Sequence, residues 1–412
     1  MTDRTIFHCD CDCFFASVEE TFNPAYKLIP MAVAGDPETR RGIILAKNQL
    51  AKKAGVKTAE TIWSARQKCP DLLLCPPRRN TYSVFCERVN AIYETYTDQV
   101  ERVGVDESFL DLTGSLHLFA GDAIAVAKEL QRRVSDEIGI TISIGISWNK
   151  IFAKLGSDQN KPNGIFSVTS ADFRETVWPL PAGDLFGVGK NAAESLRKWG
   201  IHTIGDLAQT DITFLRRQFG KMGEHLHRCS NGLDDSTVRR VGEHEPPKSI
   251  GNSFTFKRDL LTPQDIQTGV AALSDRVASR LRAHHLKCRT IQVTIKDTTL
   301  KSIQRQKAAS RATHASAEIA RLASDIIAAS WQIGKPIRLI GITAQNLVQE
   351  SARLEQLSLF ETRDDDVRTE RLEKAVDQIR GKYGCHSIQP AVILGNDLGI
   401  RDAEIADQES DD

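Results

Sequence analysis

Residues 8 to 15 of the chain read HCDCDCFF, which combines two kinds of metal-binding group, thiols and carboxylates. In a β-strand successive side chains point to opposite faces, so His8, Asp10 and Asp12 would share one face and the three cysteines the other. Zinc sites usually use C-x2–4-C spacing in a loop, which C-x-C-x-C in a strand does not match. The cysteines are therefore expected to pack beneath the strand as small apolar residues, and the chemistry is expected at the aspartates.

A second acidic pair, Asp106 and Glu107, lies in the segment GVDESFLD, within residues 99–113, which are predicted to form two strands joined by a tight turn. Carboxylates on a core strand are costly to bury unless they are paired or bind a metal. Convergence with Asp10 would give a site for hard divalent cations, and two such ions can hold the attacking and leaving oxygens of a phosphoryl transfer. The alternative is that these residues only cap a helix and form a turn. We favour the helix cap for Asp12 and the metal site for the other three carboxylates.

The composition excludes several classes of protein. The chain has 412 residues, of which 41% are hydrophobic and 26% charged, as is typical of a globular protein of several domains. Its nine cysteines contain no C-x-x-C pair, so we expect no disulfide framework. No apolar run approaches the roughly 20 residues that span a bilayer, and the N-terminus lacks the apolar core of a signal peptide. We therefore expect a cytoplasmic protein without a membrane partner.

The net charge of zero hides an uneven distribution of charge along the chain. Residues 248–345 carry 16 Lys and Arg against 6 Asp and Glu, whereas residues 346–412 carry 8 against 16. A basic module followed by an acidic tail is typical of a protein that binds a polyanion, although a solvated charged surface would give the same pattern.

The order of expected elements predicts an α+β fold. Residues 1–168 show β-α, an inserted helical region that includes residues 42–69, and then β-β-α-β with a last helix, which indicates a four-stranded sheet with helices on one face. Residues 170–236 predict short helices with glycine turns, and residues 237–247 predict a linker. Residues 248–345 repeat the order β-α-β-β-α-β, and one more helix is expected in the tail.

Three segments carry a resemblance to a known family: HCDCDCFFASVE, GVDESFLDLTG and SIGISWNKIFAKLGSDQNKPNG. They resemble the three palm motifs of the Y-family (translesion) DNA polymerases, of the DNA polymerase IV type, and the resemblance covers roughly residues 5–345 in order. It implies a right-hand polymerase with a ferredoxin-like βαββαβ palm, small helical fingers, a helix-hairpin-helix thumb and a βαββαβ little finger. The implied bounds are 1–20 and 75–168 for the palm, 21–74 for the fingers, 169–236 for the thumb, 237–247 for the linker, 248–345 for the little finger and 346–412 for the tail.

The resemblance implies a template-directed, error-prone DNA polymerase that adds dNTPs to a primer 3′-OH by a two-metal mechanism, without proofreading, in DNA damage tolerance and repair. By motif, Asp10, Asp106 and Glu107 would be the catalytic residues and would bind two Mg²⁺ ions, which Mn²⁺ could replace, with the Cys11 carbonyl as a further ligand. A monomer is expected, with primer-template DNA and dNTPs as its substrates. The alternatives are a non-catalytic homologue that acts as an adaptor bound to the sliding clamp, and a nucleotidyl cyclase on a similar palm, which the basic module disfavours.

The resemblance also implies a nucleotide site. Phe15 matches the steric gate, a ring that would exclude a ribose 2′-hydroxyl; without the motif it would be interpreted as a core aromatic. Phe14 lies beside it, and Lys161 in NKPNG matches a lysine that contacts the triphosphate.

One departure from the family pattern lies in AKNQLAKK, where Ala46, Gln49 and Lys52 stand in place of the usual Thr, Tyr and Arg. Lys52 can supply charge to a triphosphate, but as a point charge without the bidentate fork of arginine. Gln49 can still donate a hydrogen bond. We expect nucleotide binding to survive at Gln49 and Lys52 in a weakened or altered form.

Contacts with DNA are expected from two regions. The segment LFGVGKNAAESLRKWGIHTIGDLA resembles a helix-hairpin-helix, in which Gly187 and Gly189 open the hairpin and Lys190 adds charge near a phosphate. A helix-terminating glycine motif is the simpler alternative. The basic module would hold phosphates without reading sequence, through Lys257, Arg258, Arg289, Lys296 and Arg305.

A short motif in the tail, QLSLF, resembles the bacterial sliding-clamp peptide. Gln356 would enter a polar pocket of the clamp, and Leu357, Leu359 and Phe360 would be apolar anchors. A strand end packed on the preceding domain is the alternative.

Overall fold

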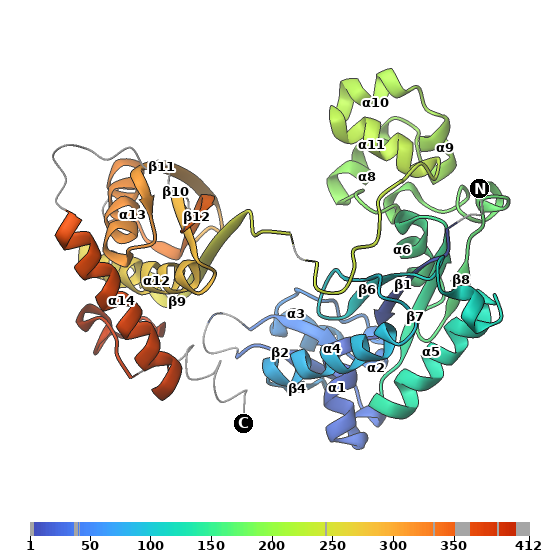
Figure 1. The fold of residues 1–412 in the computed structure, drawn as a ribbon, viewed down its shortest axis with the longest axis horizontal. Coiled ribbons are helices and arrows are strands. Elements are labelled where there is room, and N and C mark those ends of the chain that lie inside the picture. The colour runs from blue at the N-terminus through green and yellow to red at the C-terminus, as the bar shows by residue number, and fades with distance from the viewer. Residues whose placement is uncertain are drawn as a thin grey trace. The chain divides into compact units, whose positions relative to one another are not determined.

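The computed structural model describes residues 4–36, 40, 42–243, 245–332, 334–350, 363–384 and 387–400. The chain divides into two compact units, one of residues 1–35 and 43–244 and the other of residues 36–42 and 245–410 (Figure 1). The predicted clamp peptide, residues 356–360, lies outside the described residues. Among the helices of the described residues, none is long and apolar enough to cross a membrane.

The first unit is built on a five-stranded sheet with β1 at its centre. The order is β5-β6-β1-β7-β8, with β1 antiparallel to both of its neighbours. The predicted four strands are present, and the fifth, β8, is a three-residue edge strand that the sequence analysis missed. The strands are β1 (Ile6–Cys11), β5 (Val100–Arg102), β6 (Glu107–Asp111), β7 (Ile142–Ser147) and β8 (Ile165–Ser167).

Helices cover both faces of this sheet, so the prediction of helices on one face was wrong. Cys9 and Cys11 face the core formed with α4 and α5, as expected for small apolar residues. On the other face α6 packs directly on β7: a Cβ at Gly145 would lie 1.9 Å from the carbonyl oxygen of Ala153. The helices are α1 (Phe14–Phe22), α4 (Arg79–Glu94), α5 (Ala123–Ile138) and α6 (Lys150–Gln159).

The inserted region contains a small sheet as well as helices. Strand β2 (Met31–Ala34) pairs with β3 (Ile44–Lys47) and β4 (Leu73–Cys75), and the helices are α2 (Gln49–Lys53) and α3 (Ile62–Lys68). The prediction that residues 42–69 are helical throughout was therefore wrong at its start. A short apolar run such as IILA fits a strand as well as a helix, and the pairing with β2 decides between them.

Residues 170–236 form short helices with glycine turns, as predicted. Gly187 and Gly220 have φ angles of 94° and 62°, in the left-handed region that favours glycine. The helices are α7 (Phe173–Thr176), α8 (Lys190–Lys198), α9 (Ile204–Gln209), α10 (Ile212–Phe219) and α11 (Lys221–Ser230).

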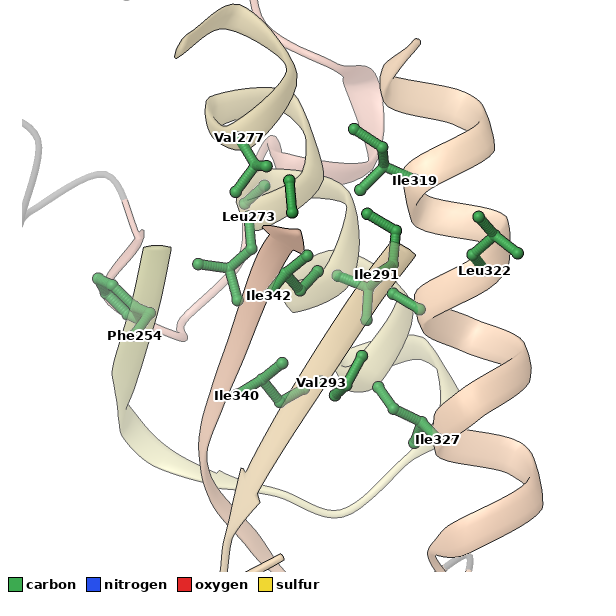
Figure 2. Close-up of a cluster of buried hydrophobic side chains, with 14 of the residues drawn as sticks. Phe254, Leu273, Val277, Ile291, Val293, Ile319, Leu322, Ile327, Ile340 and Ile342 are labelled. Carbon is green, nitrogen blue, oxygen red and sulfur yellow. The ribbon is translucent and has the colours of Figure 1, made fainter. Parts of the chain in front are cut away.

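The second unit has the predicted βαββαβ order. Its sheet has the order β11-β10-β12-β9, and two helices cover one face. Figure 2 shows Ile291, Val293 and Ile340 of the sheet beneath Leu273 and Ile319 of these helices. The elements are β9 (Ser249–Leu260), α12 (Pro263–Ala283), β10 (Leu286–Lys296), β11 (Ser302–Thr313), α13 (Ser316–Ser330) and β12 (Ile337–Gln349).

The tail packs on this second unit. The predicted tail helix is α14 (Arg363–Tyr383), and it is followed by a short 3-10 turn, Ala391–Ile393. Ile393 and Leu398 are buried in the core of the unit, and the backbone carbonyl of Leu398 accepts a hydrogen bond from the N–H of Lys257. The tail residues around Ile393 and Leu398 are thus an integral part of this fold.

Candidate active site

A cavity of about 340 Å³ opens at the end of β1 and gathers most of the predicted site residues of the first unit. Its predicted members come from β1, α1, α2, the β5–β6 turn and the loop after α6. The lining residues are Asp10, Cys11, Phe14, Phe15, Gln49, Lys52, Asp106 and Lys161, together with Asp12, Cys13, Leu45, Ala46, Lys47 and Thr58.

Strand pairing places the three predicted catalytic carboxylates close together. Asp10 lies directly opposite Glu107 in the β1–β6 register, and the N–H of Cys11 donates to the carbonyl oxygen of Asp106 over 2.8 Å. Burial raises the pKa of Asp10 and of Asp106, and each is raised further by a carboxylate neighbour. This crowding of partly buried oxygen donors fits divalent cations with a preference for oxygen ligands.

Two lysines neutralise these carboxylates. Lys161 Nζ lies 2.7 Å from Asp10 Oδ2 and 2.8 Å from Asp158 Oδ1. Burial lowers the pKa of Lys161, but these ion pairs outweigh it and the net shift is upward. Lys154 of α6 forms an ion pair with Glu107. The side chain of Glu107 thus points toward α6, and Glu107 is not among the residues that line the cavity. Sequence reasoning missed Lys154, because the packing of α6 across the sheet brings it there.

His8 is a second residue near Glu107 whose role was not predicted. It is fully buried between the sheet and α6, where its Nδ1 lies 2.8 Å from Ser157 Oγ and its Nε2 lies 3.3 Å from Glu107 Oε2. One indication of its position was present in the sequence, namely that His8 and Asp10 would share a face of the strand. Donor atoms of His8, Asp10 and Glu107 lie within 4.8 Å of one another.

The contacts of Glu107 predict an acid-sensitive contribution to stability in metal-free protein. The contact with His8 and the pairing with Lys154 lower the pKa of Glu107 from 4.5 to about 2, against the effect of burial. Since the pKa is lower in the folded state, this contribution is complete above pH 4.5 and is lost as the pH falls toward 2. We expect Glu107→Gln to flatten the pH dependence of the unfolding free energy in that window, measured by urea unfolding with a chelator. Parallel pH curves for the variant and the wild type would contradict this.

The prediction that Asp12 caps the following helix was wrong. The residue at the N-cap of α1 is Cys13, which makes no capping hydrogen bond with its side chain. The buried carboxylate of Asp12 instead accepts hydrogen bonds from Thr141 Oγ1 and Ser143 Oγ and from the N–H of Asn163, at 2.8–2.9 Å. Asp12 therefore ties the end of β1 to β7 and to the loop that carries Lys161. Cys13 lies after the strand and is only partly buried, so it departs from the predicted alternation.

The two phenylalanines at the start of α1 have different environments. Phe14 is 3% exposed and packs in the core between α1 and α4. The partly buried ring of Phe15 stacks on Tyr82, with centroids 4.2 Å apart and planes 13° apart. Phe15 is therefore the ring of this pair that can meet a molecule in the cavity.

The side of the cavity formed by β3 and α2 carries two lysines. Lys52 was predicted, and Lys47 was not; Lys47 Nζ donates to Thr58 Oγ1 over 2.9 Å, and burial lowers its pKa. Gln49 Nε2 donates to Cys13 Sγ at 3.4 Å. With Lys161 opposite, the cavity is lined by three cationic side chains.

Asn48, which the sequence analysis did not single out, fixes the junction between β3 and α2. Its side chain is buried; it accepts hydrogen bonds from the N–H groups of Met31 and Ala51 and donates to the carbonyls of Tyr26 and Ile29. One amide thus holds the helix that presents Gln49 and Lys52.

Replacing Asn48 with alanine is expected to destabilise the protein by about 2–4 kcal/mol, because it removes a helix cap and leaves buried peptide groups without partners. Thr61→Ala is a matched control, since the Thr61 side chain only caps α3, by accepting from the N–H of Ser64. That loss should be about 1 kcal/mol. Equal losses of unfolding free energy in chemical denaturation would contradict the assigned role of Asn48.

The predicted hairpin residues lie where a phosphate could approach. Gly187 and Gly189 are exposed; Gly187 adopts a φ of 94°, and Gly189 is the N-cap of α8. Lys190 is the first residue of that helix and is exposed.

The predicted basic residues of the second unit differ in their surroundings. Arg289 and Arg305 are exposed on β10 and β11, and Lys296 is half-buried. The guanidinium of Arg258 donates two hydrogen bonds to Asp265 and one to Asp397, all at 2.8–3.0 Å. Arg258 therefore holds the tail and the start of α12 within the unit, so its guanidinium is not available to a DNA phosphate in this arrangement.

Comparisons with known proteins agree on one family. A family model described as the impB/mucB/samB family matches residues 9–158, its C-terminal domain matches residues 247–359, and a DNA polymerase-iota thumb domain matches residues 183–234. DNA polymerase IV of Acetivibrio thermocellus is 42% identical over 400 residues, which cover 96% of this chain and 99% of that protein. DNA polymerase IV 1 of Bacillus subtilis is 34% identical over 393 residues, with 95% and 93% covered. A solved Y-family DNA polymerase chimera shares the fold, with a TM-score of 0.73 at 23% identity, and covers 84% of this chain and 99% of that one.

Proposed function

Because the chain belongs to the Y-family DNA polymerases of the DNA polymerase IV type, and is a DNA-directed translesion polymerase, we propose that it extends primers by a two-metal mechanism at Asp10, Asp106 and Glu107. The observation that carries this proposal is the cavity in which Asp10 and Asp106 meet Phe15, Gln49, Lys52 and Lys161. A carboxylate pair beside cationic side chains suits a triphosphate and its metal ions.

The carboxylates and the Cys11 carbonyl would hold two divalent cations, with Mg²⁺ as the proposed ion and Mn²⁺ as a substitute. Ions bound there would activate the primer 3′-OH and stabilise the charge of the leaving pyrophosphate. Lys161 pairs with Oδ2 of Asp10 and Lys154 with Oε2 of Glu107, so each ammonium group would compete with a metal ion for one oxygen of its carboxylate. Lys161, which is tethered to Asp158 as well, would then contact the triphosphate.

Lys47 and Lys52 would bind the triphosphate from the opposite side of the cavity. Two point charges together can offset the loss of an arginine fork at position 52. The lowered pKa of Lys47 reflects burial, and an anion in the cavity would favour its charged form.

We expect Lys47→Ala and Lys52→Ala each to lower kcat/KM for dNTP about tenfold, through KM, in single-nucleotide extension at saturating DNA. Lys53→Ala is the matched control, because Lys53 belongs to the same helix but does not line the cavity. A KM for Lys47→Ala equal to that of Lys53→Ala would exclude Lys47 from the nucleotide site.

Primer-template DNA would be held by Gly187, Gly189 and Lys190 of the hairpin and by the basic residues of the second unit. The proposed contacts of that unit are Lys257, Arg289, Lys296 and Arg305. Residues 356–360 would bind a sliding clamp, and the polymerase would act as a monomer, without proofreading, in DNA damage tolerance and repair.

The test is primer extension with Mg²⁺ on undamaged templates and on templates with a single lesion. The proposal requires extension on both kinds of template and no excision of a mismatched primer terminus. No extension on either template would overturn the polymerase mechanism and would favour the adaptor function, in which the family fold only docks on the clamp.

A further inference from the structure

Three side chains from separate elements of the second unit converge beside the tail helix. His314 follows β11, Glu350 follows β12, and Glu370 belongs to α14. His314 Nε2 lies 3.7 Å from Glu350 Oε1 and 3.6 Å from Glu370 Oε1. This cluster is separate from the polymerase cavity and does not depend on the function proposed above.

The imidazole of His314 is the unusual member of this cluster. The residue is 4% exposed, and its Nε2 is buried without a hydrogen-bond partner among the described residues. Buried polar atoms are nearly always hydrogen-bonded, so such an atom calls for an explanation. This unpartnered nitrogen faces the two carboxylates, which lie 3.6 and 3.7 Å from it.

A cation already lies between the two carboxylates. Lys374 Nζ is 2.8 Å from Glu350 Oε1 and 3.0 Å from Glu370 Oε1, the two oxygens that face His314. The side chain of Lys374 is 49% exposed and can turn toward solvent, which would leave two carboxylates and an imidazole around one point.

The donor set and spacing fit a transition-metal ion better than magnesium. Zn²⁺ binds imidazole nitrogen and carboxylate oxygen at about 2.0–2.2 Å, and tetrahedral geometry then places ligand atoms about 3.4 Å apart. The observed 3.6 and 3.7 Å are close to that separation. Magnesium prefers oxygen ligands and keeps several waters, so a buried imidazole disfavours it.

We propose that His314, Glu350 and Glu370 form a binding site for a divalent transition-metal ion of the Zn²⁺ class, which displaces Lys374 and ties α14 to the β-sheet of the second unit. The exposed His285 lies nearby, with its Nδ1 3.7 Å from Oε2, the other oxygen of Glu350.

Ion pairs attach α14 to the rest of the second unit, and a bound metal ion would strengthen this attachment. Arg282, buried under this helix, pairs with Glu373 and Asp377, and Arg380 of the helix pairs with Asp275. Leu372 and Ile379 of the helix remain 64% and 37% exposed, so these two apolar side chains add little to the docking. Because Glu350 precedes residues 351–362 and α14 follows them, a metal would join the two ends of that segment.

The test uses full-length protein with Asp10→Asn and Asp106→Asn, so that the polymerase site does not compete for metal, in buffer with excess Mg²⁺. Co²⁺ is titrated as a spectroscopic substitute for Zn²⁺. We expect one equivalent to bind, with the visible absorption of low-coordinate cobalt and a rise in melting temperature. Glu370→Gln and His314→Ala should each weaken binding at least about tenfold. Lys374→Met should tighten binding, and His202→Ala, an exposed histidine of the other unit, should change nothing.

Of the two variants, Glu370→Gln is expected to keep the fold, because Glu370 is partly exposed on α14 whereas His314 is buried. A loss of Co²⁺ binding in Glu370→Gln therefore does not reflect misfolding. No saturable Co²⁺ binding would overturn the proposal. So would binding that is unchanged in Glu370→Gln, or binding that appears only after Lys374→Met, because Lys374 would then be the permanent cation of the site.

Discussion

Asp106→Ala is expected to lower single-nucleotide primer extension by at least about a thousandfold, which corresponds to about 4 kcal/mol of transition-state stabilisation. Among the three predicted metal-binding carboxylates, Asp106 is the one that no lysine within 4 Å neutralises among the described ion pairs, whereas Asp10 pairs with Lys161 and Glu107 with Lys154. It is therefore the predicted ligand for which no lysine competes with a metal ion. Its loss should lower kcat and leave DNA affinity nearly unchanged.

Asp136→Ala supplies the control, because Asp136 is an exposed carboxylate on α5 that only pairs with Arg132 one helical turn away. Binding of primer-template DNA, measured by fluorescence anisotropy, distinguishes the loss of the metal site from misfolding, because only a misfolded variant should lose its DNA affinity. Extension by Asp106→Ala within tenfold of the wild type would remove Asp106 from the mechanism.

Strand alternation alone predicted which face of β1 carries Asp10. It placed Cys9 and Cys11 against a helical core and Asp10 on the opposite face, and the structure has both. Alternation is a local property that any β-strand imposes, which is why it can be read without knowing the partners of the strand. It holds for the carboxylate of Asp12 as well, although the strand ends at Cys11, because that carboxylate accepts a hydrogen bond from Ser143, the partner of Asp10 on β7.

The groups that hold the site depend on contacts distant in sequence. Lys154 and Ser157 reach Glu107 and His8 only because Gly145 lets α6 approach the sheet. Asn48 looked like any polar residue in a helical segment, and its four hydrogen bonds depend on the pairing of β2 with β3. Periodicity reports which face of an element is apolar, but it does not report which element covers that face.

Phe15→Ala is expected to raise the use of ribonucleotides relative to deoxynucleotides at least about a hundredfold, equivalent to about 2.7 kcal/mol of lost discrimination. The physical reason is the rigidity of the ring. Phe15 stacks on Tyr82, and the hydroxyl of Tyr82 donates to Glu19 Oε1 over 2.7 Å, while Glu19 pairs with Arg78. A ring supported in this way cannot yield to a 2′-hydroxyl without breaking packed contacts, so the steric penalty falls on the nucleotide.

The support that Tyr82 gives to the Phe15 ring can be tested separately from the steric effect of the ring itself. Tyr82→Leu should relax sugar discrimination partly, because Phe15 keeps its size but loses the surface that holds it. Phe22→Ala, at the exposed end of the same helix, should leave discrimination unchanged. Relative kcat/KM for matched dNTP and rNTP separates these cases, and equal selectivity in Phe15→Ala and wild type would show that another group reads the sugar. A graded order, with Phe15→Ala above Tyr82→Leu and Phe22→Ala at the wild-type value, would locate the selectivity in a supported ring and not in the volume of the cavity.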